Sequence, residues 1–196
     1  MNKNYAVETL SSCAKTYKDN LIGKNLMIIF GKESFGYIET YFTRANFLHL
    51  TGVNTKLSPG QFFNQCLNNA LNTDDFEFRK DGTTALKLQV LPHILKPKQH
   101  YKMIGEYGGN KHFLQTDKLV GGAHACLGFV KSGNFYVPNT ALQEDIRNIT
   151  RGNARIVLIL EKQLNESVYS EITYVAKNVD AADVIKVINS DKIKLQ

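Results

Sequence analysis

The segment Tyr101-Lys102-Met103-Ile104-Gly105-Glu106-Tyr107 begins the part of the chain that decides the fold. Its alternating side chains and its glycine are typical of β-strands separated by tight turns. Stretches of the same texture follow at residues 119–130, 134–138, 155–160 and 169–176. This succession predicts that the second half of the molecule is mostly an antiparallel sheet.

Helices are predicted mainly in the first half of the chain. Apolar residues recur every three or four positions over residues 4–22, which predicts a helix with one buried stripe, made of Leu10, Cys13, Tyr17 and Leu21. The sequence Ser58-Pro59-Gly60-Gln61 combines an N-cap, a proline at the first helical position and the Gln of a capping box, so a helix is expected from there to Leu71. Residues 83–97 fit a helix or a strand that Pro92 interrupts, and we favour the helix.

A hairpin and a last helix complete the expected elements. Residues 24–30 and 37–43 predict two neighbouring strands across a turn at residues 31–36, and residues 180–188 predict a short helix. We therefore expect an α+β fold, with N-terminal helices packed on a mostly antiparallel sheet. Because no repeat or low-complexity linker divides the chain, a single domain is expected over residues 1–196.

The chain carries a net positive charge. It has 24 Lys and Arg against 18 Asp and Glu, a net charge of +6, and 43% hydrophobic residues, enough for one substantial core. This charge favours a phosphate-rich or acidic partner over a neutral one. Lys and Arg never form a block of five, so the fold itself has to assemble any such binding surface.

Several classes of protein are disfavoured. Three cysteines, at positions 13, 66 and 126, are too few and too far apart for a disulfide framework, so a cytoplasmic protein is expected. The N-terminus has no apolar signal core, and no stretch approaches the roughly 18 apolar residues of a membrane span. The five histidines never stand four apart beside a carboxylate, and the common nucleotide-binding and esterase motifs are missing. We expect no metal, no cofactor and no membrane association.

The stretch Asn46-Phe47-Leu48-His49-Leu50-Thr51-Gly52 holds one histidine between apolar neighbours and ends in a glycine turn. If the apolar side chains lie in the core, His49 needs a hydrogen-bond partner or a chemical role. We place it at an edge of the sheet, as a candidate acid or base. The alternative is a core histidine held by a backbone carbonyl.

Two further stretches hold reactive or charged groups. His124 and Cys126 alternate on one predicted strand, as a base and its nucleophile would, although a cysteine in a sheet is more often part of the core. In residues 138–147, Thr140 and Gln143 have the spacing of a capping box, and a helix that starts there would offer its N-terminus to a phosphate. The alternative is a short, well-capped helix without a ligand.

Polar and basic side chains presented by a sheet, without a metal, are typical of ribonucleases that cleave RNA through the 2′-hydroxyl. Such an enzyme needs a base near that hydroxyl, cations for the pentacoordinate phosphate and an acid for the leaving 5′-oxygen. Residues of the right type are His49, Thr51, Arg147, Lys162 and Tyr169. The alternative for Arg147 is a solvated charge at a helix end, and for Lys162 a turn residue after a strand.

The order of several segments resembles a known family. The segments are residues 46–52, a helix over residues 58–71 that leads into residues 74–78, then Leu86-Lys87-Leu88 and Val90-Leu91-Pro92, and finally residues 137–140 and 145–147. From about residue 40 to 176 the chain resembles a phage-associated branch of the barnase, EndoU, colicin and RelE-like (BECR) nuclease superfamily. The resemblance implies N-terminal helices packed on a four-stranded antiparallel sheet, and a metal-independent ribonuclease or toxin-like effector encoded by phages or other mobile elements.

The resemblance also implies roles for particular residues. It supports six motif positions: His49, Thr51, Asn139, Thr140, Asp145 and Arg147. We assign His49 as acid or base, Thr51 as an orienting hydroxyl, Arg147 as a phosphate-binding cation, and the other three as substrate-binding residues. Lys162 and Tyr169 are added on chemical grounds, Lys162 as a second cation. No second histidine stands at a motif position, so a histidine working with Arg, Lys or Tyr is expected rather than a pair of histidines.

Two other functions stay open. A non-catalytic mobile-element protein with this fold would hold RNA or block a host defence complex, and a transferase would act on a nucleotide such as NAD. Replacing His49 with Ala should inactivate a folded enzyme, whereas a binder should weaken gradually as single Lys and Arg are removed. The expected partners are RNA and an antitoxin or host defence protein.

Overall fold

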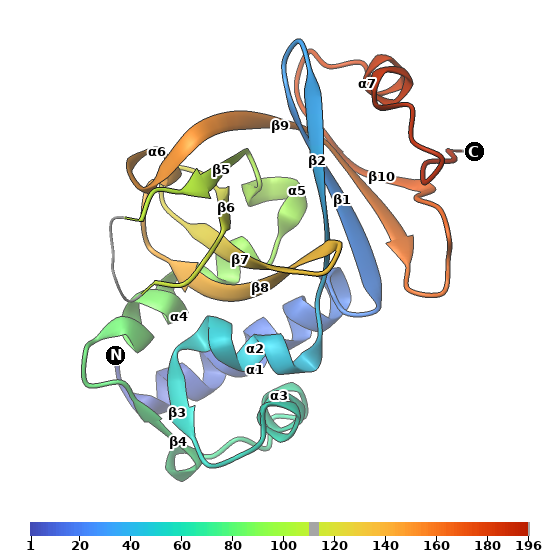
Figure 1. The fold of residues 1–196 in the computed structure, drawn as a ribbon. Helices are drawn as coiled ribbons and strands as arrows, with labels where there is room; N and C mark the ends of the chain where they lie inside the picture. The colour runs from blue at the N-terminus through green and yellow to red at the C-terminus, as the bar shows by residue number, and fades with distance from the viewer. Residues whose placement is uncertain (110–113, 196) are drawn as a thin grey trace.

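The computed structural model describes residues 1–109 and 114–195 and has the expected α+β fold (Figure 1). Helices from the first half of the chain lie together beside a large sheet. The helices are α1 Lys3–Asn20, α2 Arg44–Thr51, α3 Pro59–Leu67, α4 Thr83–Ile94, α5 Pro97–His100, α6 Ile146–Ile149 and α7 Ala181–Ile188. A 3-10 turn, Thr73–Asp75, precedes β4.

The main sheet closes on itself. Its strands lie in the order β1-β2-β8-β7-β6-β5-β9-β10, and β1 also pairs with β9. All these pairings are antiparallel except β2 with β8, which is parallel and joins Thr40 to Tyr136. The strands are β1 Lys24–Gly31, β2 Phe35–Tyr41, β5 Met103–Tyr107, β6 Lys118–Gly121, β7 Cys126–Ser132, β8 Phe135–Leu142, β9 Thr150–Gln163 and β10 Glu171–Val175, while β3 Val53–Thr55 and β4 Phe76–Phe78 form a separate pair.

The sheet is larger than the four strands that the resemblance implied. The predicted β1–β2 hairpin is confirmed and joins the sheet, and β9 is extended at both ends relative to residues 155–160. Residues 119–130 form parts of two strands rather than one, because the chain turns between β6 and β7. Gly121 permits this turn, since a Cβ at that position would lie 2.2 Å from the carbonyl oxygen of Ala125.

The predicted N-terminal helix is confirmed, and its apolar stripe forms the main core. Leu10, Cys13 and Tyr17 are buried in α1. The ring of Tyr17 contacts Phe47 of α2 at 5.3 Å and Phe63 of α3 at 5.7 Å between centroids, and its hydroxyl donates a 2.8 Å hydrogen bond to the carbonyl of Thr43. One aromatic cluster therefore fixes three helices against the sheet.

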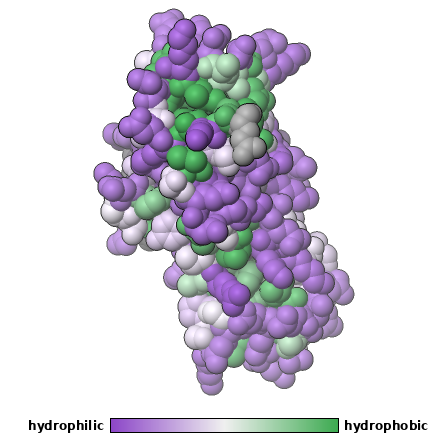
Figure 2. Space-filling model, turned by 90° about the vertical axis from the view of Figure 1, so that its right-hand side faces the viewer, coloured by the Kyte–Doolittle hydropathy of each residue, from purple (hydrophilic) through white to green (hydrophobic). Residues whose placement is uncertain are grey.

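Strand β1 is buried on both faces, because α7 covers the side of the sheet opposite α1. Leu26 and Ile28 belong to the main core, whereas Met27 and Ile29 belong to a second cluster with Val184 of α7. This division follows the two-residue period of a strand. Figure 2 shows hydrophobic side chains gathered on the upper part of the face that carries α7 and the C-terminal segment.

The helix predicted from Ser58 to Leu71 is confirmed as α3 but ends at Leu67, and the helix favoured over residues 83–97 is confirmed as α4, which contains Pro92 and ends at Ile94. The helix predicted from Thr140 is wrong. Strand β8 continues through Leu142, because its pairing with β7 places Thr140 opposite Gly128, and the short helix α6 begins only after Asp145. None of the described helices is both long and apolar enough to cross a membrane.

Candidate active site

Three histidines line a cavity where α4, α5 and the β6–β7 loop meet, which we call the histidine cavity. His93 comes from the last turn of α4, His100 ends α5, and His124 comes from the loop. The cavity has a volume of about 500 Å³, which lies within the range of small-molecule sites, about 300–1,000 Å³. The remaining lining residues are Gln89, Val90, Gln99, Lys102, Gly122, Ala123, Ala125 and Gln143.

The bend between α4 and α5 brings His93 and His100 together. Helix α4 ends at Ile94, and Pro97 occupies the first turn of α5, where its missing N–H leaves no hydrogen bond unmade. The two imidazole centroids lie 5.2 Å apart, with the ring planes at 68°. His93 is exposed and His100 is half-buried, so the pair combines access to solvent with a partly dry environment.

The surroundings of His100 favour its neutral form. Burial lowers the pKa of His100 below the ordinary value, and the nearby positive charges of His93, Lys96 and Lys102 lower it further. A neutral imidazole accepts a proton, which is the property of a general base.

Lys102 supplies a fixed cation at the same cavity. Its ammonium group donates a 3.1 Å hydrogen bond to the carbonyl of Lys98 and lies 4.1 Å from the ring centroid of Tyr174. The backbone N–H of Lys102 donates to the carbonyl of Gly121 at 3.1 Å, which ties this residue to the start of the β6–β7 loop. An ammonium has three donors, so a further acceptor such as a phosphate oxygen can bind it.

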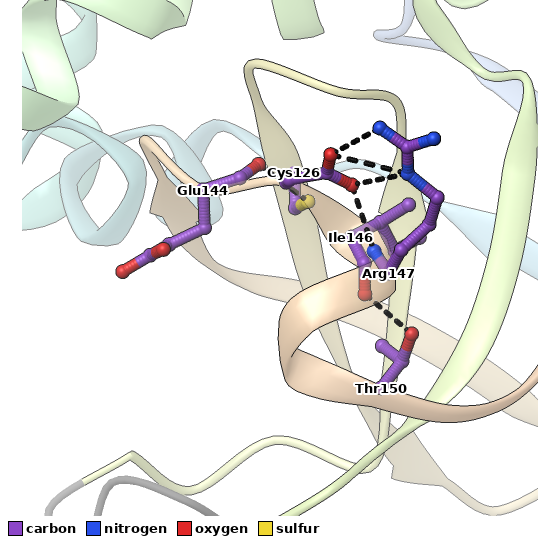
Figure 3. Close-up of polar contacts among 6 residues, drawn as sticks. Cys126, Glu144, Ile146, Arg147 and Thr150 are labelled. Carbon is purple, nitrogen blue, oxygen red and sulfur yellow. Dashed lines mark hydrogen bonds and ion pairs between the residues drawn. The ribbon is translucent and has the colours of Figure 1, made fainter.

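The loop that carries His124 is held by the start of α6. The backbone N–H of Ile146 donates to the carbonyl of Gly122 at 3.0 Å, and that of Gly122 donates to Ala125 at 3.1 Å. Asp145 caps α6, and its carboxylate also accepts hydrogen bonds from the guanidinium of Arg147 (Figure 3). Hydrogen bonds from Arg147 lower the pKa of Asp145 to about 2, and the charge of nearby His124 contributes.

This geometry corrects the phosphate site predicted at the start of a helix near Thr140. Helix α6 has four residues, and the carboxylate of Asp145 already accepts the backbone N–H of Arg147 at 2.9 Å. A carboxylate at this position repels a phosphate. Arg147 is paired with it, with 62% of its side chain exposed, and lies beside the histidine cavity rather than among its lining residues.

The pairing of Cys126 with His124 as nucleophile and base is also wrong. Cys126 is buried in β7, and its thiol donates to the carbonyl of Glu144 at 3.3 Å. Burial raises the pKa of this thiol to about 12, so the reactive thiolate is disfavoured. His124 lies in the loop before the strand and is exposed.

His49 lies in a helix, not at an edge of the sheet. It stands in the last turn of α2, where its side chain is exposed and its carbonyl accepts the ammonium of Lys87 at 3.0 Å. Burial lowers the pKa of Lys87 to about 8. Thr51 is fully buried and donates its hydroxyl to the carbonyl of Leu48 at 2.8 Å, so it serves the end of the helix. The expected glycine turn is confirmed, because Gly52 adopts φ 68° at the C-cap.

Lys162 and Tyr169 are not among the lining residues of the histidine cavity, and their contacts lie elsewhere. The ammonium of Lys162 donates to the carbonyl of Ser167 at 3.2 Å, and the Tyr169 ring lies below it at 5.1 Å. Tyr169 is buried and donates its hydroxyl to Glu39 at 3.0 Å. The structure therefore does not bring these two residues together with Arg147 or His49.

Asn139 and Thr140 are held within the sheet. Thr140 is buried, and its methyl group would lie 2.6 Å from a Cβ on Gly128. The side-chain amide of Asn139 donates to the carbonyl of Gln115. Both side chains thus fix the β7–β8 region, and neither lines the histidine cavity.

The sequence did not identify the three histidines as one site, because they are not close in the chain. His93 and His100 are seven residues apart and His124 lies twenty-four further on, so no short motif joins them. One signal was present, since two histidines flank the basic segment Lys96-Pro97-Lys98. Among the described residues, no cluster of His, Cys, Asp or Glu has the arrangement of a metal site, and His112 lies outside the described residues.

The fold and the family comparison define the class of this protein as a BECR-type nuclease. A family model matches residues 9–178, and the chain belongs to that family, described as phage-Barnase-EndoU-ColicinE5/D-RelE like nuclease 4. This match confirms the resemblance drawn from the sequence and covers most of the chain. Neither a search of curated proteins nor a search of solved structures gave a match.

Proposed function

We propose that this protein is a metal-independent ribonuclease of a phage or other mobile element, with its active site in the histidine cavity. The observation that carries the proposal is the joint lining of one cavity by His93, His100, His124 and Lys102. These groups supply a base, an acid and a cation, which are the requirements for cleavage through the 2′-hydroxyl. Membership in a nuclease family supports the choice of reaction.

In the proposed reaction, neutral His100 removes the proton of the 2′-hydroxyl. The 2′-oxygen attacks the adjacent phosphorus, and the bond from phosphorus to the 5′-oxygen breaks. His124, which lies beside the Asp145 carboxylate, gives its proton to the leaving 5′-oxygen. Lys102 stabilises the negative charge of the pentacoordinate phosphate. The products are a 2′,3′-cyclic phosphate and a 5′-hydroxyl, and one proton has passed from His124 to His100 by way of the substrate.

The test is cleavage of total bacterial RNA in EDTA, followed on a denaturing gel. Wild type should give discrete products, and His100→Ala and His124→Ala should each lose activity by about 10²–10⁴-fold, the usual contribution of a general acid or base. His49→Ala is the matched control, because it removes another exposed histidine outside the cavity. Circular dichroism of each variant checks that it is folded.

The outcomes separate three hypotheses. Loss of cleavage in His49→Ala alone would move the active site to the end of α2, as the sequence motif first indicated. Intact RNA with wild type, together with binding that weakens stepwise as Lys and Arg are removed, would favour the non-catalytic alternative, a protein that holds RNA or blocks a host defence complex. Cleavage that EDTA abolishes would contradict metal independence. An antitoxin stays a proposed partner, which co-purification with the active protein would identify.

A further inference from the structure

A second cavity adjoins the histidine cavity across α5. It has a volume of about 300 Å³, and its lining residues are Asn20, Lys24, Lys96, Pro97, Lys98, Gln99, Glu161, Glu171 and Thr173. Gln99 lines both cavities. The two cavities are therefore neighbours that share Gln99 as part of their walls.

The charged groups of the second cavity fall into three sets: the pair of Lys24 and Glu161, the two lysines Lys96 and Lys98, and the carboxylate of Glu171. Glu161 is buried and fully engaged, since it accepts Lys24 at 2.9 Å and the hydroxyl of Thr173 at 3.2 Å. Lys24 and Glu161 thus neutralise each other. Lys96 and Lys98 are exposed, and neither forms an ion pair with another described residue. These two ammonium groups are the positive charges left for a ligand, and they outnumber the one remaining carboxylate of the cavity, that of the exposed Glu171.

Lys96 and His100 connect the two cavities within one helical turn. Lys96 is the N-cap of α5 and His100 is its last residue, four positions later. Residues at this spacing lie about 5–6 Å apart between Cβ atoms. The charge of Lys96 also contributes to the lowered pKa of His100. An anion bound by Lys96 therefore lies next to the group that reacts at His100.

We infer that the second cavity is a subsite for the neighbouring nucleotide of an RNA strand, whose phosphate binds Lys96 and Lys98. The inference rests on the proposed function and specifies its substrate as an oligonucleotide rather than a dinucleotide. A groove of positive charge that follows the backbone is a common way to bind single strands. The side chains of Gln99, Glu171 and Thr173 provide polar groups for the ribose or base of that nucleotide.

The experiment compares two substrates and one charge reversal. A dinucleoside monophosphate has only the phosphate that is cleaved, whereas a hexanucleotide also reaches the second cavity. Lys98→Glu should raise the KM for the hexanucleotide about tenfold, equivalent to about 1.4 kcal/mol, and leave cleavage of the dinucleoside monophosphate unchanged. Lys186→Glu, which makes the same charge change on α7, should affect neither substrate.

Binding gives a readout that does not need cleavage. A fluorescent 2′-deoxy hexanucleotide lacks the attacking hydroxyl, so its anisotropy reports affinity alone. Lys98→Glu should weaken this binding and reduce the salt slope by about 0.7 for one lost phosphate contact. Equal effects of Lys98→Glu and Lys186→Glu in both assays would overturn the subsite. If wild type cleaves neither substrate, the proposed reaction fails, and the anisotropy comparison alone decides the subsite.

Discussion

His100 differs from the other histidines of the cavity in its surroundings, because its ring is partly buried and faces nearby positive charges. Its lowered pKa keeps the base neutral at pH values where an ordinary histidine is protonated. The acid limb of the profile of kcat/KM against pH should therefore lie below about 6.5. His93→Gln removes one positive neighbour, so we expect the limb to move to higher pH.

An NMR titration of the His100 ring protons measures the same shift without activity. Their pKa should rise in His93→Gln, because the charged form of His100 then meets less repulsion. A pKa that stays constant or falls in this variant would show that His93 does not act on His100. His49→Gln, which changes a histidine outside the cavity, serves as the control.

Tyr169 offers a second test at the scale of one residue, since its buried hydroxyl donates to the buried carboxylate of Glu39. Tyr169→Phe removes a hydrogen bond to a charged group and should lower the free energy of unfolding by about 1.5–3 kcal/mol. Tyr37→Phe, at a side chain with 40% exposure, should change it by less than about 0.5 kcal/mol. Urea unfolding measures both. Lost cleavage by folded Tyr169→Phe would restore the catalytic role first expected for this tyrosine.

Helix α2 ends at Gly52, where a side chain would also collide with Lys87 of the neighbouring helix α4. A Cβ on Gly52 would lie 2.7 Å from Cδ of Lys87, whose ammonium binds the last turn of α2. Gly23 has a similar positive φ of 83° but no atom within 4 Å of such a Cβ. Both Gly→Ala variants incur the left-handed backbone cost of about 1–2 kcal/mol.

Gly52→Ala should therefore lower the free energy of unfolding more than Gly23→Ala, because only Gly52→Ala displaces Lys87. The difference between the two urea midpoints measures that contact. Equal losses would mean that the Lys87 side chain moves aside at no cost.

Elements with a complete local signal were predictable, and those set by pairing were not. Ser58 and Gln61 form the expected capping box of α3, because every group in that motif comes from neighbouring residues. Thr140 and Gln143 have the same spacing, but hydrogen bonds to β7 keep Thr140 in a strand. The histidine cavity could not be predicted for a related reason, since its three histidines come together only after α4, α5 and the β6–β7 loop have packed.

At the scale of the whole molecule, closure of the sheet joins the two halves of the chain. Strand β1 pairs with β9 over residues that include Met27 and Leu160, and the main core contains side chains from α1 as well as β9. We expect one cooperative unfolding transition. Far-ultraviolet circular dichroism and tyrosine fluorescence should give coincident urea curves. Two separate transitions would contradict the single domain expected from the sequence.

The ribosome makes the chain from its N-terminus, and this order gives the closure of the main sheet a further consequence. The backbone N–H of Ile156 in β9 donates to the carbonyl of Lys102 at 2.9 Å, so the last long strand holds the cation of the histidine cavity in place. Contacts between residues so distant in sequence form slowly. A nascent chain that has not yet reached β9 lacks this anchor while it is still held close to the RNA of the ribosome. We expect the proposed nuclease to become active only after β9 has been translated.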